Sequence, residues 1–194
     1  MKSLALILVL AVAALGQQPA PSGKTVGLAV AKVTVEVFSD YQCPHCKEFY
    51  EKTLKPLIGE YARNNKIYFI HREYPLPGHQ YAKEAACLAC AAERVGKYEQ
   101  VCDALFRDQD SWSKSGKVAD TACSALSPAE AKRVRVLAHD AAVIAEVDHD
   151  IALGHSLKLN STPVMFIKSA GQSYPAGPVS YPVLRRVVEQ LLSR

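Results

Sequence analysis

The sequence lacks a block of charge of one sign and has only one long apolar run. Its 23 basic and 19 acidic side chains give a net charge of +4 and are scattered along the chain. Nucleic-acid-binding surfaces gather basic residues into a patch or stripe, so nucleic acid is not expected as a partner. With only 10 glycines and 11 prolines in 194 residues, of which 49% are hydrophobic, disorder and a collagen helix are excluded. The composition is that of a folded domain.

The one long apolar run lies at the start of the chain, from Leu4 to Leu15, after the single positive residue Lys2. It is too short for a stable transmembrane span. Small residues at Ala14-Leu15-Gly16 suit a signal peptidase, so residues 1–16 are predicted to be a cleaved signal peptide. An uncleaved anchor is the alternative. In both cases the folded part is expected to be periplasmic or secreted, where disulfides persist.

The rest of the chain is predicted to form a single domain over residues 33–194, after a polar, proline-rich flexible leader at 17–32. Strands are predicted at Val33 to Phe38 and Lys66 to His71, with a helix that begins at Pro44 between them. Residues 79 to about 158 contain one proline and have helical spacing, which predicts an all-helical insertion. Its expected breaks are at Gly96, at 109–116 and at Ser127-Pro128, where Ser127 and Glu130 suit a capping box.

After the insertion, strands are predicted at Val164 to Ile167 and near Tyr174, joined by a turn, and a helix is predicted from Tyr181 to Leu192. Strands separated by a long helical crossover imply parallel pairing, and a tight turn implies antiparallel pairing. The predicted fold class is therefore α/β, with one central mixed sheet flanked by helices and an inserted helical subdomain.

The motif Cys43-Pro44-His45-Cys46 lies where the first strand ends and the helix begins. Pro44 suits the first helical turn because it has no N–H to leave unpaired. Cys43 then faces free backbone N–H groups and the positive end of the helix dipole, both of which favour its thiolate. His45 adds a donor or a partial positive charge, and Cys46 can close a ring with Cys43. A thiolate stabilised in this way is a good leaving group, so a disulfide here is easily transferred.

Two other interpretations of these cysteines remain open. Cys87 and Cys90 form a second CxxC pair, so the two pairs together resemble a four-cysteine zinc layout. The second pair, however, lies in an alanine-rich helix without a glycine turn, far from the first. A purely structural disulfide is the other interpretation. A CxxC beside a strand–helix–strand pattern is primarily a redox signature.

Several features occur in a fixed order along the chain: residues Val37 to Gln42, the motif that follows them, the stretch Arg72 to Pro77, the helical insertion and Ser161-Thr162-Pro163. Together they resemble the DsbA-like branch of the thioredoxin superfamily. The resemblance covers about Val33 to Leu192. It implies a thioredoxin fold and an enzyme that oxidises thiols of exported proteins. The alternatives are a reductase or isomerase that uses the same site, because the dipeptide alone does not fix the direction of transfer, and a protein that binds zinc or copper through Cys43, His45 and Cys46.

The resemblance also implies a role for each site residue. Cys43 would be the exposed nucleophile and Cys46 the buried resolving thiol, while Pro44 and His45 tune the pair. Thr162-Pro163 would form a cis peptide bond facing the disulfide, whereas the residues alone leave cis and trans open. The implied partners are reduced or unfolded exported polypeptides and a quinone-linked membrane protein that reoxidises the site. No cofactor or metal is expected, because the Cys43/Cys46 disulfide is itself the redox group.

One residue departs from the family pattern. Many relatives carry a buried acid six residues before the nucleophile, and Val37 occupies that position here. Glu36 is shifted by one residue, so in a strand it should point to the opposite face. We therefore expect Glu36 to be a surface or strand-edge residue outside the catalytic set.

The four remaining cysteines, Cys87, Cys90, Cys102 and Cys123, lie in the predicted insertion. A helical hairpin that turns at Gly96 would bring Cys90 level with Cys102, which favours the pairs 90 with 102 and 87 with 123. A second redox pair at Cys87 and Cys90 is the functional alternative, but it lacks the strand-to-helix junction of Cys43. Five further histidines show no metal-ligand spacing and are expected to be structural or at the surface: His71, His79, His139, His149 and His155.

Overall fold

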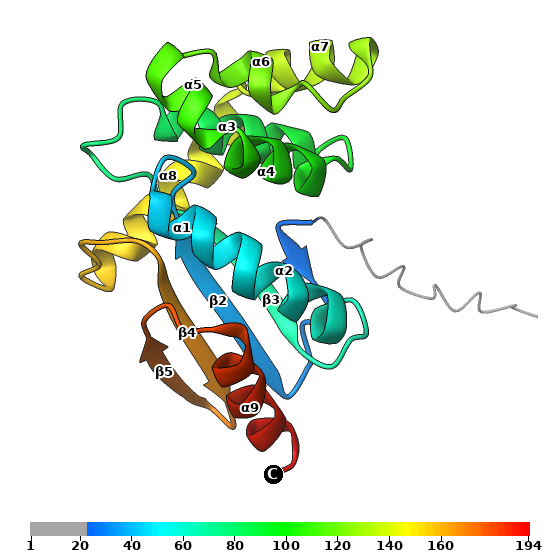
Figure 1. Cartoon of the computed structure of the whole chain (residues 1–194), viewed down its shortest axis with the longest axis vertical. Coiled ribbons are helices and arrows are strands. Elements are labelled where there is room, and N and C mark those ends of the chain that lie inside the picture. The colour runs from blue at the N-terminus through cyan, green and yellow to red at the C-terminus, as the bar shows by residue number, and fades with distance from the viewer. Residues whose placement is uncertain (1–22) are drawn as a thin grey trace, which may run out of the picture.

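The computed structural model of the chain describes residues 23–194 (Figure 1). The predicted signal peptide at 1–16 and the beginning of the predicted leader lie outside these residues. Five strands form one mixed sheet in the order β1-β3-β2-β4-β5. The strands are β1 (Thr25–Val26), β2 (Val33–Ser39), β3 (Tyr68–Glu73), β4 (Val164–Ser169) and β5 (Gln172–Ala176). As predicted, segments from both ends of the chain build one sheet.

The pairing of the strands is partly as expected. β2 and β3 are parallel, and β4 and β5 form the predicted antiparallel pair. The expectation of parallel pairing across the long helical block is wrong, because β4 pairs antiparallel with β2. The register explains this, since Ser39 pairs with Glu73 and Phe38 pairs with Val164. The chain thus leaves and re-enters the sheet at the same end, and the returning strand must run the opposite way.

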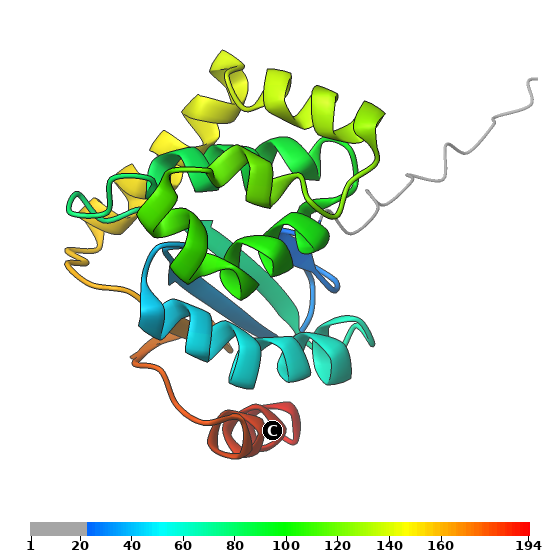
Figure 2. The ribbon, with the colours of Figure 1, turned by 45° about the horizontal axis from the view of Figure 1, so that its top comes forward.

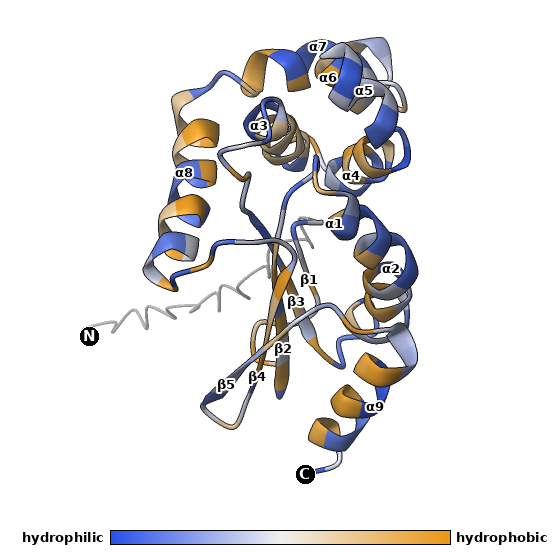
Figure 3. Ribbon diagram, turned by 60° about the vertical axis from the view of Figure 1, so that its left-hand side comes forward, coloured by the Kyte–Doolittle hydropathy of each residue, from blue (hydrophilic) through white to orange (hydrophobic). Residues whose placement is uncertain are grey.

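Helices cover both faces of the sheet (Figure 3). On one side lies an almost continuous helix made of α1 (Pro44–Phe49), the π-helical turn η1 (Tyr50–Leu54), α2 (Lys55–Leu57) and the π-helical turn η2 (Ile58–Ala62), together with α9 (Tyr181–Leu192). On the other side lies α8 (Ala141–Ser156). Val33, Val35 and Val37 alternate along β2 and are each at most 1% exposed, which fits β-branched residues in a central strand. This rigid strand carries the active-site turn at its end.

The insertion stacks over the end of the sheet where β2 and β3 finish (Figure 2). It contains α3 (Ala82–Glu93), α4 (Tyr98–Arg107), α5 (Gln109–Ser115), α6 (Val118–Ala122), α7 (Pro128–Leu137) and α8. Gly96 separates α3 from α4, and Ser127 and Glu130 form the predicted capping box. Over residues 23–194, each helix is too short or too polar to cross a bilayer.

The predicted break at 109–116 is wrong, because residues 109–115 form α5. Trp112 explains the helix, since its side chain is fully buried and its Nε1–H donates to the Leu105 carbonyl at 2.7 Å. The break itself is confined to Gly116, whose φ of 71° ends the helix in the left-handed conformation. Tertiary packing therefore overrides a run of polar residues with weak helical preference.

The predicted flexible leader is also wrong for its described part. Thr25 and Val26 form β1, which pairs antiparallel with β3. Lys24 is buried, and its ammonium group lies 2.5 Å from Glu146 and 2.8 Å from Asp150 of α8. A polar composition suggested a solvated segment, but this lysine binds one buried carboxylate, Asp150, and one partly buried carboxylate, Glu146. The N-terminal segment thus ties the sheet to the insertion.

Candidate active site

The motif Cys43-Pro44-His45-Cys46 lies at the predicted junction of strand and helix. Cys43 is the N-cap of α1, with extended backbone angles, and Pro44 is in the first turn. The Cys43 carbonyl accepts the N–H groups of Cys46 at 3.1 Å and Lys47 at 3.2 Å. The first turn of α1 therefore closes on the Cys43 carbonyl, which places the Cys43 side chain at the N-terminus of the helix.

Both sulfur atoms of the motif are covered. Cys43 is 5% exposed and Cys46 is 1% exposed, so the expectation that the Cys43 sulfur lies in solvent is wrong. In its protonated form the Cys43 thiol donates to the Thr162 carbonyl at 3.4 Å, and the Cys46 sulfur accepts the Asp40 N–H at 3.4 Å. The Thr162 loop lies over the motif because β4, which follows it, pairs with β2. The Thr162-Pro163 peptide bond is cis, as the resemblance implied.

The pKa values of the two thiols are shifted in opposite directions. Hydrogen bonds from the Cys46 side chain, from Thr162, and from the backbone N–H groups of Cys46 and His45 lower the pKa of Cys43 to about 5. They outweigh partial desolvation, which acts in the opposite direction. Burial, and then the adjacent Cys43, raises the pKa of Cys46 well above its usual value. Near neutral pH the reduced site therefore holds one thiolate, on Cys43, and one thiol, on Cys46.

Pro44 and His45, the tuning residues implied by the resemblance, are both exposed. The backbone N–H of His45 helps to lower the pKa of Cys43. His45 lines a surface hollow of about 420 Å³ together with Phe49. In this structure, His45 therefore supports the thiolate through its backbone.

Sequence reasoning missed two residues that hold the active-site turn. Asp40 is 1% exposed and accepts the Gln42 N–H at 2.7 Å through its carboxylate. Gln109 of α5 is 2% exposed, and its amide donates to the carbonyls of Tyr41 at 2.6 Å and Cys43 at 3.0 Å. An aspartate that binds the N–H two residues later is typical of turns, so the sequence held a signal for Asp40. Gln109 had none, since it lies in the segment predicted as a break.

A buried polar cluster lies beneath the turn. The Glu73 carboxylate accepts the hydroxyl of Tyr98 at 2.8 Å, while the hydroxyl of Tyr41 lies 3.4 Å away. Burial raises the pKa of Glu73 to about 8. His71 packs against the rings of Tyr41 and Tyr98, and burial lowers its pKa to about 3, so its ring is neutral. Of the predicted structural histidines, His71 thus lies in the core.

Glu36 points to the sheet face opposite Val37, as predicted, but it is neither at the surface nor on an edge strand. It is 2% exposed in the central strand β2 and binds Arg72 at 2.7 Å and Lys168. The alternation of a strand predicts the face, but it cannot reveal that α8 covers it. These cations offset the cost of burial and lower the pKa of Glu36.

The four cysteines of the insertion are unpaired in the structure, so neither the expected pair 90 with 102 nor 87 with 123 is present. The Cys90 sulfur instead accepts a hydrogen bond from the Lys24 ammonium at 3.6 Å, and the Cys102 sulfur accepts one from the Tyr41 hydroxyl at 3.5 Å. The helices are adjacent as the hairpin argument required, but adjacency alone does not bring two sulfur atoms together.

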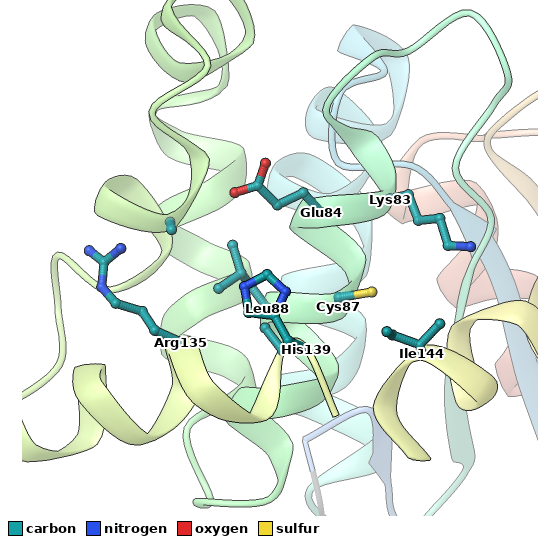
Figure 4. Close-up of a pocket in the computed structure, with 9 residues that line it drawn as sticks. Lys83, Glu84, Cys87, Leu88, Arg135, His139 and Ile144 are labelled. Carbon is teal, nitrogen blue, oxygen red and sulfur yellow. The ribbon is translucent and has the colours of Figure 1, made fainter. Parts of the chain in front are cut away.

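Cys87 lines a hollow of about 470 Å³ among α3, α7 and α8, together with Leu88, His139 and Ile144 (Figure 4). Burial raises the pKa of Cys87 to about 11. At neutral pH this thiol is protonated and a poor nucleophile. The structure therefore gives no support to Cys87 as part of a second redox pair.

Among residues 23–194, no three or more His, Cys, Asp or Glu side chains are grouped as a metal site would require. His79 contacts Asp40, His155 packs on Tyr74, and His139 and His149 are exposed on the insertion. The zinc layout suggested by the two CxxC pairs is thus not assembled in the described part of the chain.

Comparison with known proteins adds to this geometry. Residues 20–189 match a family model described as thioredoxin. Among curated proteins, 81 residues are 33% identical to the Na(+)/H(+) antiporter NhaA 3 of Salinispora tropica. That match covers 41% of this chain but only 12% of the length of the antiporter.

Solved structures resemble the whole fold. The alpha-DsbA1 protein of Wolbachia pipientis has a TM-score of 0.71 at 22% identity, with 88% of this chain and 90% of that chain covered. A thioredoxin-like oxidoreductase of Silicibacter pomeroyi has a TM-score of 0.71 at 24% identity, covering 90% and 95%. A periplasmic thioredoxin-like protein of Salmonella enterica serovar Typhimurium has a TM-score of 0.62 at 20% identity, covering 91% and 93%. The helical insertion is part of this shared fold.

Proposed function

Since the chain belongs to the thioredoxin family, we propose that it is a thiol:disulfide oxidoreductase and works as an oxidase that donates the Cys43/Cys46 disulfide to reduced exported proteins. The observation that supports transfer of the disulfide from the protein to the substrate is the lowered pKa of Cys43, at about 5. A stabilised thiolate favours the reduced form of the site, so the oxidised form gives its disulfide away readily.

The transfer takes two steps. A substrate thiolate attacks the Cys43 sulfur, the bond between Cys43 and Cys46 breaks, and the Cys46 sulfur leaves and takes a proton. A second substrate thiolate then attacks the substrate sulfur of this mixed disulfide, and Cys43 leaves as a thiolate. The substrate loses two electrons and two protons, of which Cys46 keeps one proton and the solvent receives the other. The high pKa of Cys46 and the low pKa of Cys43 suit these two roles.

A substrate chain could bind beside the motif. The hollow of about 420 Å³ lies between α1 and the loop that leads into α9, where Phe49, Val179 and Pro182 supply apolar surface. It reaches His45, two residues from Cys43, so a peptide in this hollow would carry its cysteine to the nucleophile. Apolar contacts of this kind suit unfolded polypeptides of varied sequence, because they impose few directional requirements.

Each turnover leaves the site reduced, so an oxidant must restore the disulfide. We assign this step to a quinone-linked membrane protein that accepts both electrons through exchange at Cys43. Export from the cytoplasm is supported by the predicted signal peptide and by the likeness to the periplasmic protein of Salmonella enterica. An oxidising compartment also lets the donated disulfides persist.

The equilibrium of the purified protein with glutathione tests the proposed direction. We expect a reduction potential near the value of about −120 mV known for strongly oxidising proteins of this kind. A potential near about −270 mV, the value of a reductase such as thioredoxin, would refute an oxidase. As a second readout, Cys46→Ala treated with an oxidant should hold a substrate that has a single thiol as a stable mixed disulfide on Cys43, because neither Cys46 nor a second substrate thiol is present to release it.

A further inference from the structure

Asp40 contacts both cysteines of the site through its backbone. Its N–H donates to the Cys46 sulfur at 3.4 Å, and its carbonyl accepts the Cys43 N–H at 3.1 Å. The residue is 1% exposed. A small displacement of Asp40 would therefore alter the hydrogen bonds of both cysteines.

The Asp40 carboxylate is held from a distant loop. Besides the Gln42 N–H, it accepts the Leu76 N–H at 2.8 Å and lies 2.7 Å from Nδ1 of His79. A carboxylate can only accept, so Nδ1 of His79 carries the proton in this contact. The His79 side chain is 28% exposed, whereas the Asp40 side chain that it contacts is fully buried.

We propose that His79 is a positioning residue for the Cys43/Cys46 pair, which acts through Asp40 to stabilise the reduced form of the site. Its Nδ1–H fixes the Asp40 carboxylate, and thereby keeps the Asp40 N–H on the sulfur of Cys46. The inference rests on the dithiol–disulfide chemistry proposed above, and adds a residue that lies 33 positions beyond Cys46 in the sequence.

The effect should favour reduction for an electrostatic reason. Reduction of the site by a substrate dithiol places a thiolate on Cys43 and a thiol on Cys46, with one proton released. Without a donor at His79, the Asp40 carboxylate loses one of its hydrogen-bond partners. The Asp40 N–H is then held less firmly on the Cys46 sulfur, which shares the negative charge of the reduced pair through its hydrogen bond with Cys43. That arrangement raises the free energy of the reduced form, while the uncharged disulfide is affected less.

Three variants of the full chain separate this role from mere packing. His79→Ala removes the donor, His79→Asn keeps an N–H donor near the position of Nδ1, and Pro77→Ala changes an exposed residue of the same loop. The equilibrium with glutathione and the thiolate absorbance of Cys43 are measured for each. We expect His79→Ala to shift the equilibrium constant about tenfold toward the disulfide form, which is about 30 mV, and to raise the thiolate midpoint. His79→Asn and Pro77→Ala should stay within about twofold of the wild type.

The proposal is overturned if His79→Ala keeps the wild-type constant, or if His79→Ala and His79→Asn shift it equally. Thermal unfolding of the oxidised and reduced forms is an independent test. A positioning role requires His79→Ala to destabilise the reduced form more than the oxidised form, whereas equal destabilisation would show a structural role only. Failure of the wild-type protein to exchange with glutathione at all would instead refute the dithiol–disulfide chemistry itself.

Discussion

Cys43 in the active-site turn and Cys87 in the insertion are almost equally covered, at 5% and 7% exposed, yet their acidities differ greatly. The pKa of Cys43 is lowered to about 5, whereas that of Cys87 is raised to about 11. Burial acts on both thiols in the same direction. The difference therefore comes from the hydrogen-bond donors that only Cys43 has.

These donors follow from the position of each cysteine in its helix. Cys43 is the N-cap of α1, where the N–H groups of His45 and Cys46 in the first turn help to lower its pKa. Cys87 lies in the interior of α3, where the backbone N–H groups are already bound to carbonyls. Two CxxC pairs that look alike in the sequence thus have opposite chemistry, because one begins a helix and the other lies within one.

The largest difference should appear in activity. Cys43→Ser should abolish oxidation of a reduced model peptide, since the nucleophile is lost and Ser is not acidic enough to replace it. Cys87→Ser, the matched control, should keep the rate within about twofold. Peptide oxidation followed by mass spectrometry checks both. Loss of activity in a folded Cys87→Ser protein would show that the second CxxC pair takes part in the reaction.

The sequence predicted the reactive pair because its signals are local. Cys43, Pro44 and Cys46 lie within one turn of helix, so their chemistry follows from the strand that precedes them and the helix they begin. Gln109 and His79 could not be found in this way, because they reach the motif from the insertion and from the loop after β3. Their role is visible only when the fold brings these segments together.

A second difference should appear in stability as pH changes. The pKa of Cys43 is lower in the folded protein than the usual value of about 8.5 in an unfolded chain. Its contribution to stability is therefore fully present above about pH 8.5 and is lost as pH falls toward about 5. We expect the reduced wild type to gain several kcal/mol relative to Cys43→Ser between these limits.

Chemical denaturation of the two reduced proteins at several pH values measures this difference. Groups such as Glu73, whose pKa is raised to about 8, occur in both proteins, so their contributions cancel. Cys87→Ser is again the control and should show no such pH dependence relative to the wild type in this range, because the Cys87 thiol stays protonated in both states up to about pH 8. A constant gap between the wild type and Cys43→Ser from pH 5 to 8.5 would contradict the assigned acidity.

The fold was predictable where hydrophobic spacing decides it. The final helix was predicted at its observed bounds, and the strands β2 and β4 differ from their predictions only at their ends. The errors arose from contacts distant in sequence. Lys24 is ordered by α8, more than a hundred residues later, and α5 forms because Trp112 is buried. Composition describes a segment in water and therefore misses such partners.

The smallest effect should come from the cysteines of the insertion. Cys102 is 1% exposed and accepts the Tyr41 hydroxyl at 3.5 Å, so Cys102→Ala removes an acceptor and leaves a small cavity. We expect a loss of about 1 to 3 kcal/mol in the free energy of unfolding. Cys102→Ser keeps an acceptor for Tyr41 and should cost less. Peptide oxidation should stay within about twofold of the wild type in both variants, because Cys102 contacts Tyr41 and not the reacting sulfurs.

Alkylation of the unfolded, oxidised wild type without reductant tests whether the cysteines of the insertion are paired. Four labelled thiols are expected if the cysteines of the insertion are unpaired, as in the structure, whereas two would show that a bridge such as 90 with 102 forms in the exported protein. In that case Cys102→Ala would also break a covalent link, and its loss of stability should rise to about 3 kcal/mol or more.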